Sequence, residues 1–183
     1  MAISCLPTYP LVLFGIIEPI LLTWGYITGI QNPSKFYADQ VPNAPITTTI
    51  TTIPPQALTL TLALLNVYLL LAALAIVCCF TAHAPVARGF LLAVAIADYG
   101  HVYATYAGAG PAVFWDPLGS WNGMVWGSVG VSLFLNVHRW LTLLGVFGRL
   151  GGGGGGNGES GSAGGSGSDS AGLGKGMEVK KQA

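Results

Sequence analysis

Charged residues are scarce in this chain, and their scarcity indicates its class. Only 8% of the 183 residues are charged, whereas a soluble domain carries about 25%. Eight of the charges lie in the first 150 residues, too few to cover the surface of a soluble core of that size. Lys and Arg balance Asp and Glu at seven each, which excludes a nucleic-acid binder that works through a basic patch. The composition predicts a membrane protein with no nucleic-acid partner.

Cysteine is rare, and the common catalytic motifs are missing. Cys5 stands alone and Cys78 and Cys79 are adjacent, so we expect no disulfide framework and interpret the three side chains as packing residues. The sequence contains no paired metal-binding cysteines, no HExxH and no GxSxG, which are the patterns of metal sites and nucleophilic triads. We expect no cofactor and no metal, and no motif names a reaction.

Four long apolar runs dominate the first 150 residues. A helix needs about 20 apolar residues to cross a bilayer. The first run carries one charge, Glu18, and the second carries none, whereas the third and fourth are less apolar. The third and fourth runs could also be buried helices of a soluble domain. The two strongly apolar runs beside them favour membrane spans instead. The sequence predicts an all-α four-helix bundle, integral to the membrane, with spans at residues 11–30, 57–80, 89–107 and 124–147.

The remaining segments are predicted to be loops and a tail. Connections are short except for residues 31–56, whose Pro-rich and Thr-rich stretch predicts an extended loop outside the lipid. Residues 151–183 hold 14 glycines in 33 residues and few apolar side chains. That composition cannot offset the entropy of ordering, so residues 1–150 form the predicted membrane domain and residues 151–183 a disordered tail.

Positive charge near the spans predicts the orientation, because short cytosolic loops are rich in Lys and Arg. Four spans place both termini on the same side of the membrane, and Arg88 and Arg149 lie on that side. The other side has Lys35 beside Asp39 and Asp116. Both termini are therefore predicted to be cytosolic.

The last four residues carry a possible address. Lys180-Lys181-Gln182-Ala183 resembles the dilysine signal that returns membrane proteins to the endoplasmic reticulum, and a receptor reads such a signal only on a cytosolic tail. The alternative is a chance match in a Lys-containing disordered tail. We expect a multi-pass protein of the endoplasmic reticulum membrane.

Three ionisable residues lie inside the apolar runs, where a charge costs about 2.5 to 3.5 kcal/mol at the bilayer centre. A helical rise of about 1.5 Å per residue places Glu18, Asp98 and Arg139 in one layer of the inner leaflet. His101 and Asn66 come out only slightly deeper. Ionisable groups at this depth indicate either a functional site or a buried pair.

Helical spacing also predicts which residues share a face. In the first run, Gly25-x-x-x-Gly29 permits close helix approach, while Pro19 frees the carbonyl of Gly15 and predicts a kink. The polar stripes are Asp98, His101 and Thr105 in the third run, and Ser128, Ser132, Asn136 and Arg139 in the fourth.

The polar cluster has two interpretations. In the structural one, Glu18 and Asp98 share Arg139 while His101 and Asn66 satisfy leftover acceptors, so the network fixes helix register. In the functional one, a carboxylic acid beside an imidazole in an apolar pocket suits isomerisation or cyclisation of a lipophilic substrate. Aromatic side chains would line that pocket, with an interfacial belt as the alternative. The candidate catalytic residues are Glu18, Asp98 and His101, and the candidate binding residues are Asn66, Tyr103, Trp126, Asn136 and Arg139.

A further set of motifs spans the apolar runs: Ile17-Glu18-Pro19, the Asp-x-Gly-His element within residues 97–106, and Trp121-Asn122 and Trp126-Gly127 before Arg139. Over residues 10–147 these motifs resemble an uncharacterised family of fungal four-pass membrane proteins. The resemblance implies a four-helix membrane fold and no established reaction, and the family has Asn where this chain has Ser128. At the level of fold alone, the chain is distantly similar to the emopamil-binding, sterol isomerase-like superfamily and to membrane-bound terpene cyclases, which have more spans.

Two functions stay open at this point. The leading hypothesis is an accessory acid–base protein, isomerase-like or cyclase-like, that acts on a lipophilic secondary metabolite. The alternative is a non-catalytic scaffold or lipid-binding protein whose buried charges only hold helices together. A transporter is a third option. It would require two four-span chains to dimerise, because four spans alone do not form a path. The expected partners are membrane lipids and a lipophilic small molecule, and the sequence leaves the oligomeric state open.

The address predicts a simple outcome. Replacing Lys180 and Lys181 together with Ser removes both receptor-read charges, so a tagged protein should leave the endoplasmic reticulum for later compartments, as scored by fluorescence microscopy. The matched control is Lys175→Ser, which removes a tail charge outside the motif. An unchanged reticular distribution of the double variant would show that the match is accidental.

Overall fold

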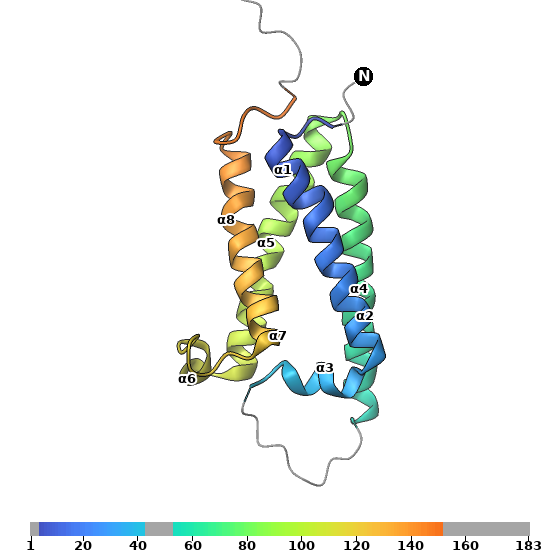
Figure 1. Ribbon diagram of the computed structural model, residues 1–183, viewed down its shortest axis with the longest axis vertical. Coiled ribbons are helices and arrows are strands. Elements are labelled where there is room, and N and C mark those ends of the chain that lie inside the picture. Colours follow the sequence, from blue (N-terminus) through green and yellow to red (C-terminus); the bar gives the residue numbers. More distant parts are fainter. Residues whose placement is uncertain (1–3, 43–52, 152–183) are drawn as a thin grey trace, which may run out of the picture.

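The computed structural model describes residues 4–42 and 53–151, and this part of the chain is helical with no strand (Figure 1). Four long helical segments lie beside one another, and two short helices connect them. The first long segment is α1 (Thr8–Val12), η1 (Leu13–Ile17) and α2 (Glu18–Gln31), the second α4 (Pro55–Cys79), the third α5 (Ala84–Ala109), and the fourth α7 (Gly123–Val125), η2 (Trp126–Gly130) and α8 (Val131–Leu143). The connecting helices are α3 (Pro33–Asp39) and α6 (Pro111–Phe114).

The predicted all-α class is confirmed for the described residues. The predicted runs 11–30 and 89–107 lie within long segments, whereas 57–80 and 124–147 extend past the helix ends at Cys79 and Leu143. Two of these segments, Thr8–Gln31 and Pro55–Cys79, are long and apolar enough to cross a membrane by length and composition. The predicted tail at residues 152–183 and the Thr-rich stretch at residues 43–52 lie outside the described residues.

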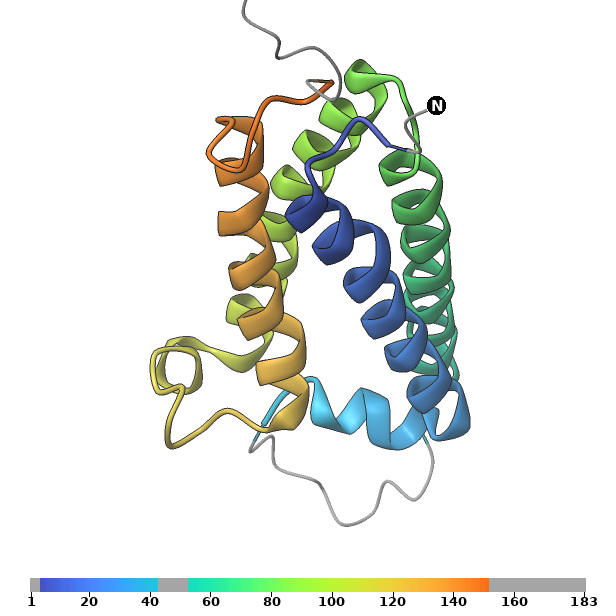
Figure 2. The ribbon, with the colours of Figure 1, turned by 45° about the horizontal axis from the view of Figure 1, so that its top comes forward.

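The four segments form two pairs that are joined at their ends. Helix α2 packs along α4, and α5 packs along α8. The pairs meet at the end where the chain enters and leaves, because α1 contacts α8 there and Gly151 donates a hydrogen bond from its N–H to the carbonyl of Cys5 (2.8 Å). At the other end α3 crosses from one pair to the other (Figures 1 and 2). We call these the termini end and the α3 end.

The packed hydrophobic core lies at the termini end. Phe14, Cys79, Leu91 and Leu135 come from all four long segments and are buried together. Cys5 and Cys79 are buried here and no disulfide forms, as the interpretation as packing residues requires. Burial raises the pKa of the Cys5 thiol, so it stays protonated. Tight packing at one end leaves room between the pairs at the other.

A π-helical turn precedes Pro19, where the sequence predicts a kink. Pro19 has no N–H to donate to the Gly15 carbonyl. The preceding residues Leu13–Ile17 form the wider π-helical turn η1, which ends immediately before Glu18. The hydroxyl of Thr23 donates to the Pro19 carbonyl (2.8 Å). Such π-turns occur mostly as single turns inside α-helices, often at functional sites.

The connection at residues 31–56 is not a loop throughout, because residues 33–39 form α3, a helix that the sequence pattern did not predict. The Asn32 side chain caps this helix by accepting a hydrogen bond from the Lys35 N–H (3.0 Å), and Pro33 suits the first helical position. Phe36 is buried and packs edge-on against Tyr68 of α4, with ring centroids 6.2 Å apart. A cap followed by Pro and one buried aromatic therefore outweighs the loop-like composition.

The Gly25-x-x-x-Gly29 motif permits the predicted close approach of a helix, and that helix is α4. A Cβ on Gly29 would overlap Leu65, which is fully buried, and would lie 3.1 Å from the Phe36 ring. Gly29→Ala should therefore push α2 away from α4 and destabilise the protein by about 1 to 3 kcal/mol, measured as a lower midpoint of thermal unfolding in detergent. The matched control Gly89→Ala adds a methyl group in open space on α5 and should be neutral or slightly stabilising. Equal midpoints for the two variants would contradict the close packing.

Candidate functional site

A buried guanidinium joins three of the long segments. Arg139 of α8 pairs through Nη2 with Oε1 of Glu18, the first residue of α2, and through Nη1 with Oδ2 of Asp98 on α5 (2.5 Å). Arg139 is 1% exposed and Glu18 is 6% exposed. The predicted convergence of these three residues is confirmed, and the forked guanidinium suits the binding of two carboxylates at once.

Two neighbours complete the network. Asn136, one turn before Arg139, donates hydrogen bonds from Nδ2 to the Ala95 carbonyl (2.7 Å) and to Asp98 Oδ2 (3.3 Å). The Phe14 ring lies 5.4 Å from the Arg139 Cζ, within range of a cation–π contact. The amide of Asn136 thus fixes both the backbone of α5 and its carboxylate, so its predicted place in the cluster is confirmed.

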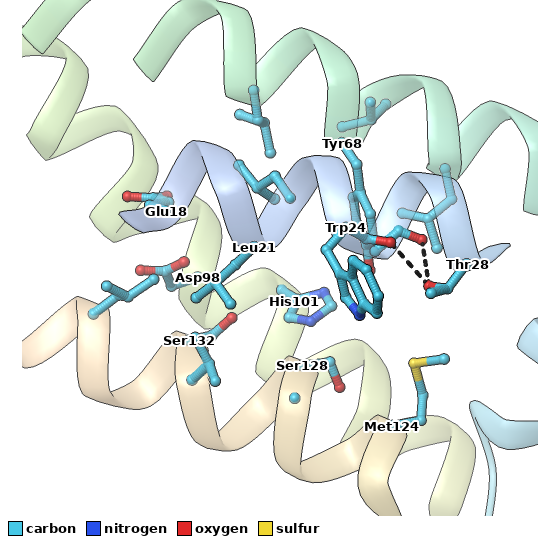
Figure 3. A pocket seen from close by; sticks show the side chains of 18 of the residues that line it. Glu18, Leu21, Trp24, Thr28, Tyr68, Asp98, His101, Met124, Ser128 and Ser132 are labelled. Atoms are coloured by element: carbon cyan, nitrogen blue, oxygen red, sulfur yellow. Dashed lines mark hydrogen bonds between the residues drawn. The ribbon is translucent and has the colours of Figure 1, made fainter. Parts of the chain in front are cut away.

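A cavity of about 740 Å³ opens between the two helix pairs, beside this network. Its polar end holds the three charged residues of the network, and its opposite end lies against α3, where Lys35 and Asp39 form an ion pair. The walls between are mostly apolar or aromatic and include Leu21, Trp24, Tyr68 and Met124 (Figure 3). Because Trp24 lines the cavity and is 65% exposed, the cavity reaches the outer surface of the protein.

His101 projects into this cavity. Figure 3 shows its ring beside Trp24, and Ser128 of the neighbouring η2 also lines the cavity. Asp98 lies one turn earlier on α5 and points to the same side. Among the described residues, no side chain or backbone group forms a hydrogen bond with the imidazole, whereas Arg139 is bound by two carboxylates. The imidazole of His101, which lines the cavity, is therefore free to contact a bound molecule.

Three predicted binding residues lie elsewhere. Asn66 is exposed on the outer face of α4, because its neighbour Leu65 faces α2 and a step of one residue turns the helix by about 100°. Tyr103 is 68% exposed, two residues from His101 and hence on the opposite face. Trp126 packs against Trp121, with ring centroids 5.0 Å apart, and lines no part of the cavity. The expectation that these aromatic side chains of α5 and η2 line the pocket is wrong.

The aromatic walls of the cavity come instead from α2, α3 and α4, through Trp24, Phe36 and Tyr68. A signal for Tyr68 was present, because Gly25 leaves room for a large side chain on the facing helix, and the Tyr68 ring lies 3.3 Å from the position of a Cβ there. In the part of the chain that the structure describes, no group of three or more His, Cys, Asp or Glu could hold a metal ion.

The sequence matches one known protein family. A family model described as "Domain of unknown function (DUF7704)" matches residues 3–149. The chain belongs to this family. The DUF7704 match covers all four long segments, the Arg139 network and the cavity, and it ends before the Gly-rich tail. No curated protein and no solved structure matches the sequence.

The network makes a stability prediction. Arg139→Met leaves two buried carboxylates without a counter-charge, so it should destabilise the DUF7704 domain by about 3 to 5 kcal/mol, measured by thermal unfolding in detergent. Adding Glu18→Gln and Asp98→Asn to this variant removes the stranded charges and should restore part of the loss. The matched control Arg88→Met lies at the start of α5, outside the network. A single Arg139 variant as stable as the control would show that the ion pairs do not hold the helices.

Proposed function

We propose that this DUF7704 protein is a four-span protein of the endoplasmic reticulum membrane that binds a lipophilic small molecule and moves a proton on it. One observation carries the proposal: a largely apolar cavity between the helix pairs has an imidazole and a buried network of carboxylates at one end.

Side-chain exposure supports the membrane setting. Only 28% of the apolar window of the first segment and 22% of that of the second are buried, whereas the core helix of a soluble protein is mostly buried. The third and fourth segments also present large apolar side chains outward, such as Ile96 and Val137. Soluble monomers rarely expose apolar patches of more than a few hundred Å², but lipid accepts such a surface without cost. We infer that all four segments cross the bilayer.

The distribution of charge supports the proposed orientation. Arg88 and Arg149 line one small pocket at the termini end, and Lys35 and Asp39 lie at the α3 end. Positive charge then favours the termini end as the cytosolic side, which also exposes the dilysine motif to its receptor.

The cavity suits a lipophilic ligand. Its volume falls within the range of about 300 to 1,000 Å³ that is usual for small-molecule sites, and its exposed Trp24 lies on a surface that faces lipid in the proposed setting. A molecule dissolved in the bilayer can enter sideways between α2 and α8 and reach His101.

The chemistry follows from the groups that remain free. His101 is the group placed to take a proton from one carbon of the ligand and return it to another, and Asp98 beside it stabilises the imidazolium formed in between. Such an isomerisation needs no second substrate, and a cyclisation triggered by protonation uses the same groups. Arg139 and Asn136 both donate hydrogen bonds to Asp98 Oδ2 and hold it in place, so they act as positioning residues.

The alternative is a non-catalytic scaffold or lipid-binding protein, and one observation favours it. Both forked nitrogens of Arg139 are occupied by carboxylates from other helices, an arrangement that holds helices together whether or not a reaction takes place. In this alternative the cavity binds a lipid, and His101 makes no proton transfer.

His101→Gln separates the two functions. Gln keeps a polar side chain of similar length but cannot move a proton at neutral pH, so product should fall by about a hundredfold or more at unchanged protein abundance. The measurement compares metabolite profiles of a deletion strain complemented with wild-type or variant protein. The matched control, His83→Gln, changes an exposed histidine outside the cavity. A profile that is the same for the deletion, wild-type and variant strains would refute the reaction.

A further inference from the structure

Asp98 presents one carboxylate oxygen to the cavity. Arg139 and Asn136 both donate hydrogen bonds to its Oδ2, and Oδ1 has no hydrogen-bond partner among the described residues. Glu18 Oε2 and Arg139 Nε also lack partners, but the bundle encloses both atoms. The Asp98 side chain lines the cavity and is 12% exposed. Its Oδ1 is therefore the free oxygen of the network that a bound molecule can reach.

The polar end of the cavity carries one negative charge in excess. The charged side chains that line the cavity are Glu18, Asp39, Asp98, Lys35 and Arg139. Lys35 pairs with Asp39 at the α3 end, so the polar end has two carboxylates against one guanidinium. An uncompensated charge is costly in a low-dielectric interior. A ligand carboxylate, sulfate or phosphate would add to the excess, an alcohol would leave it unchanged, and a cation would cancel it.

We propose that the polar end of the cavity binds the ammonium group of a lipophilic amine, an inference that rests on the proposed function and names its ligand class. An N–H of the ammonium donates a charge-assisted hydrogen bond to Asp98 Oδ1, and its positive charge cancels the excess of the network. Ser132 of α8 also lines the cavity and offers its hydroxyl oxygen as a further acceptor (Figure 3).

The rest of the cavity fits the body of such a molecule. His101 lies one turn after Asp98 and points to the same side of α5, so the carbon atoms next to the bound nitrogen come close to the imidazole. The walls beyond it include Leu21, Trp24 and Tyr68, and aromatic faces accept both apolar groups and cations. The ligand therefore lies with its charge at the network and its apolar body toward α3.

The test compares molecules that share one chain and differ in the head group. The full-length protein in phosphatidylcholine nanodiscs is photolabelled with hexadecylamine or with hexadecanol, each carrying a diazirine on the chain, and labelled peptides are mapped by mass spectrometry. Hexadecylamine, hexadecyltrimethylammonium, hexadecanol and hexadecyl sulfate without the diazirine then compete with each probe at the same low mole fraction of the lipid. Labelling that excess competitor removes marks a saturable site.

The head group sets the expected order of competition. Hexadecylamine should compete best, and hexadecanol should be weaker by about tenfold or more because it brings no charge to the unbalanced carboxylate. The trimethylammonium keeps the charge but has no N–H for Asp98 Oδ1, so it should lie between these two. Hexadecyl sulfate should be the weakest of the four.

Two variants with matched charge locate the effect. Asp98→Asn and Asp39→Asn each remove one carboxylate from the lining, but at opposite ends of the cavity. Asp98→Asn leaves one carboxylate against one guanidinium at the polar end, so the preference for the amine over the alcohol should disappear. Asp39→Asn should keep that preference. The wild-type series decides the question even if Asp98→Asn fails to fold.

The outcomes distinguish this inference from the function beneath it. If the cavity segments show saturable labelling but another competitor is as effective as hexadecylamine, or folded Asp98→Asn keeps the wild-type preference, the ammonium site is refuted while the lipophilic cavity stands. An alcohol as effective as the amine is also the result expected if a proton on His101 balances the network. If neither probe gives saturable labelling of the cavity segments, the proposed function and the ammonium site are refuted together.

Discussion

The double ion pair of Arg139 is the interaction on which the rest of this structure depends. One guanidinium on α8 binds a carboxylate at the start of α2 and another on α5, so it joins the two helix pairs at mid-height. A buried ion pair gains little net stability over a well-packed apolar contact, but losing one partner is strongly destabilising. The network therefore acts on register and orientation: it specifies where α2 lies against α5 and α8, and with that the position of the cavity.

The second constraint is the way the helix pairs are held at their two ends. At the termini end the packed core brings all four segments together, and at the α3 end the Asn122 side chain donates a hydrogen bond to the Asp39 carbonyl (2.9 Å), linking α3 to the start of α7. Between these two closures the Arg139 ion pairs bridge the helix pairs, and the cavity lies beside this bridge. A cavity that lies between these two closures and reaches the outer surface at Trp24 suits a ligand that arrives through the lipid, as proposed, better than one that arrives from water.

The sequence predicted the charged residues of the network but not the aromatic side chains that line the cavity. A charge within an apolar run is conspicuous, and helical spacing placed Asp98, Asn136 and Arg139 on facing stripes. Depth alone, however, does not determine which way a side chain faces. Asn66 was predicted at a similar depth, but it is exposed on the outward side of α4. The cavity itself depends on the angle between two helix pairs, which no local pattern encodes. Trp24 lines it only because the turn before Pro19 and the close packing at Gly29 determine the course of α2.

The structural and functional interpretations of the network are compatible. If the carboxylates served register alone, each oxygen would gain by being satisfied within the bundle, since unpartnered buried acceptors reduce stability. The protein instead uses one oxygen of Glu18 and one of Asp98 for the guanidinium and leaves the other of each without a described partner, beside a cavity into which His101 points. The carboxylate oxygens that face Arg139 hold the helices, and Oδ1 of Asp98, which lines the cavity without a described partner, is the one left for a ligand in the proposed function. The same ion pairs thus supply the rigidity that the proposed proton transfer needs.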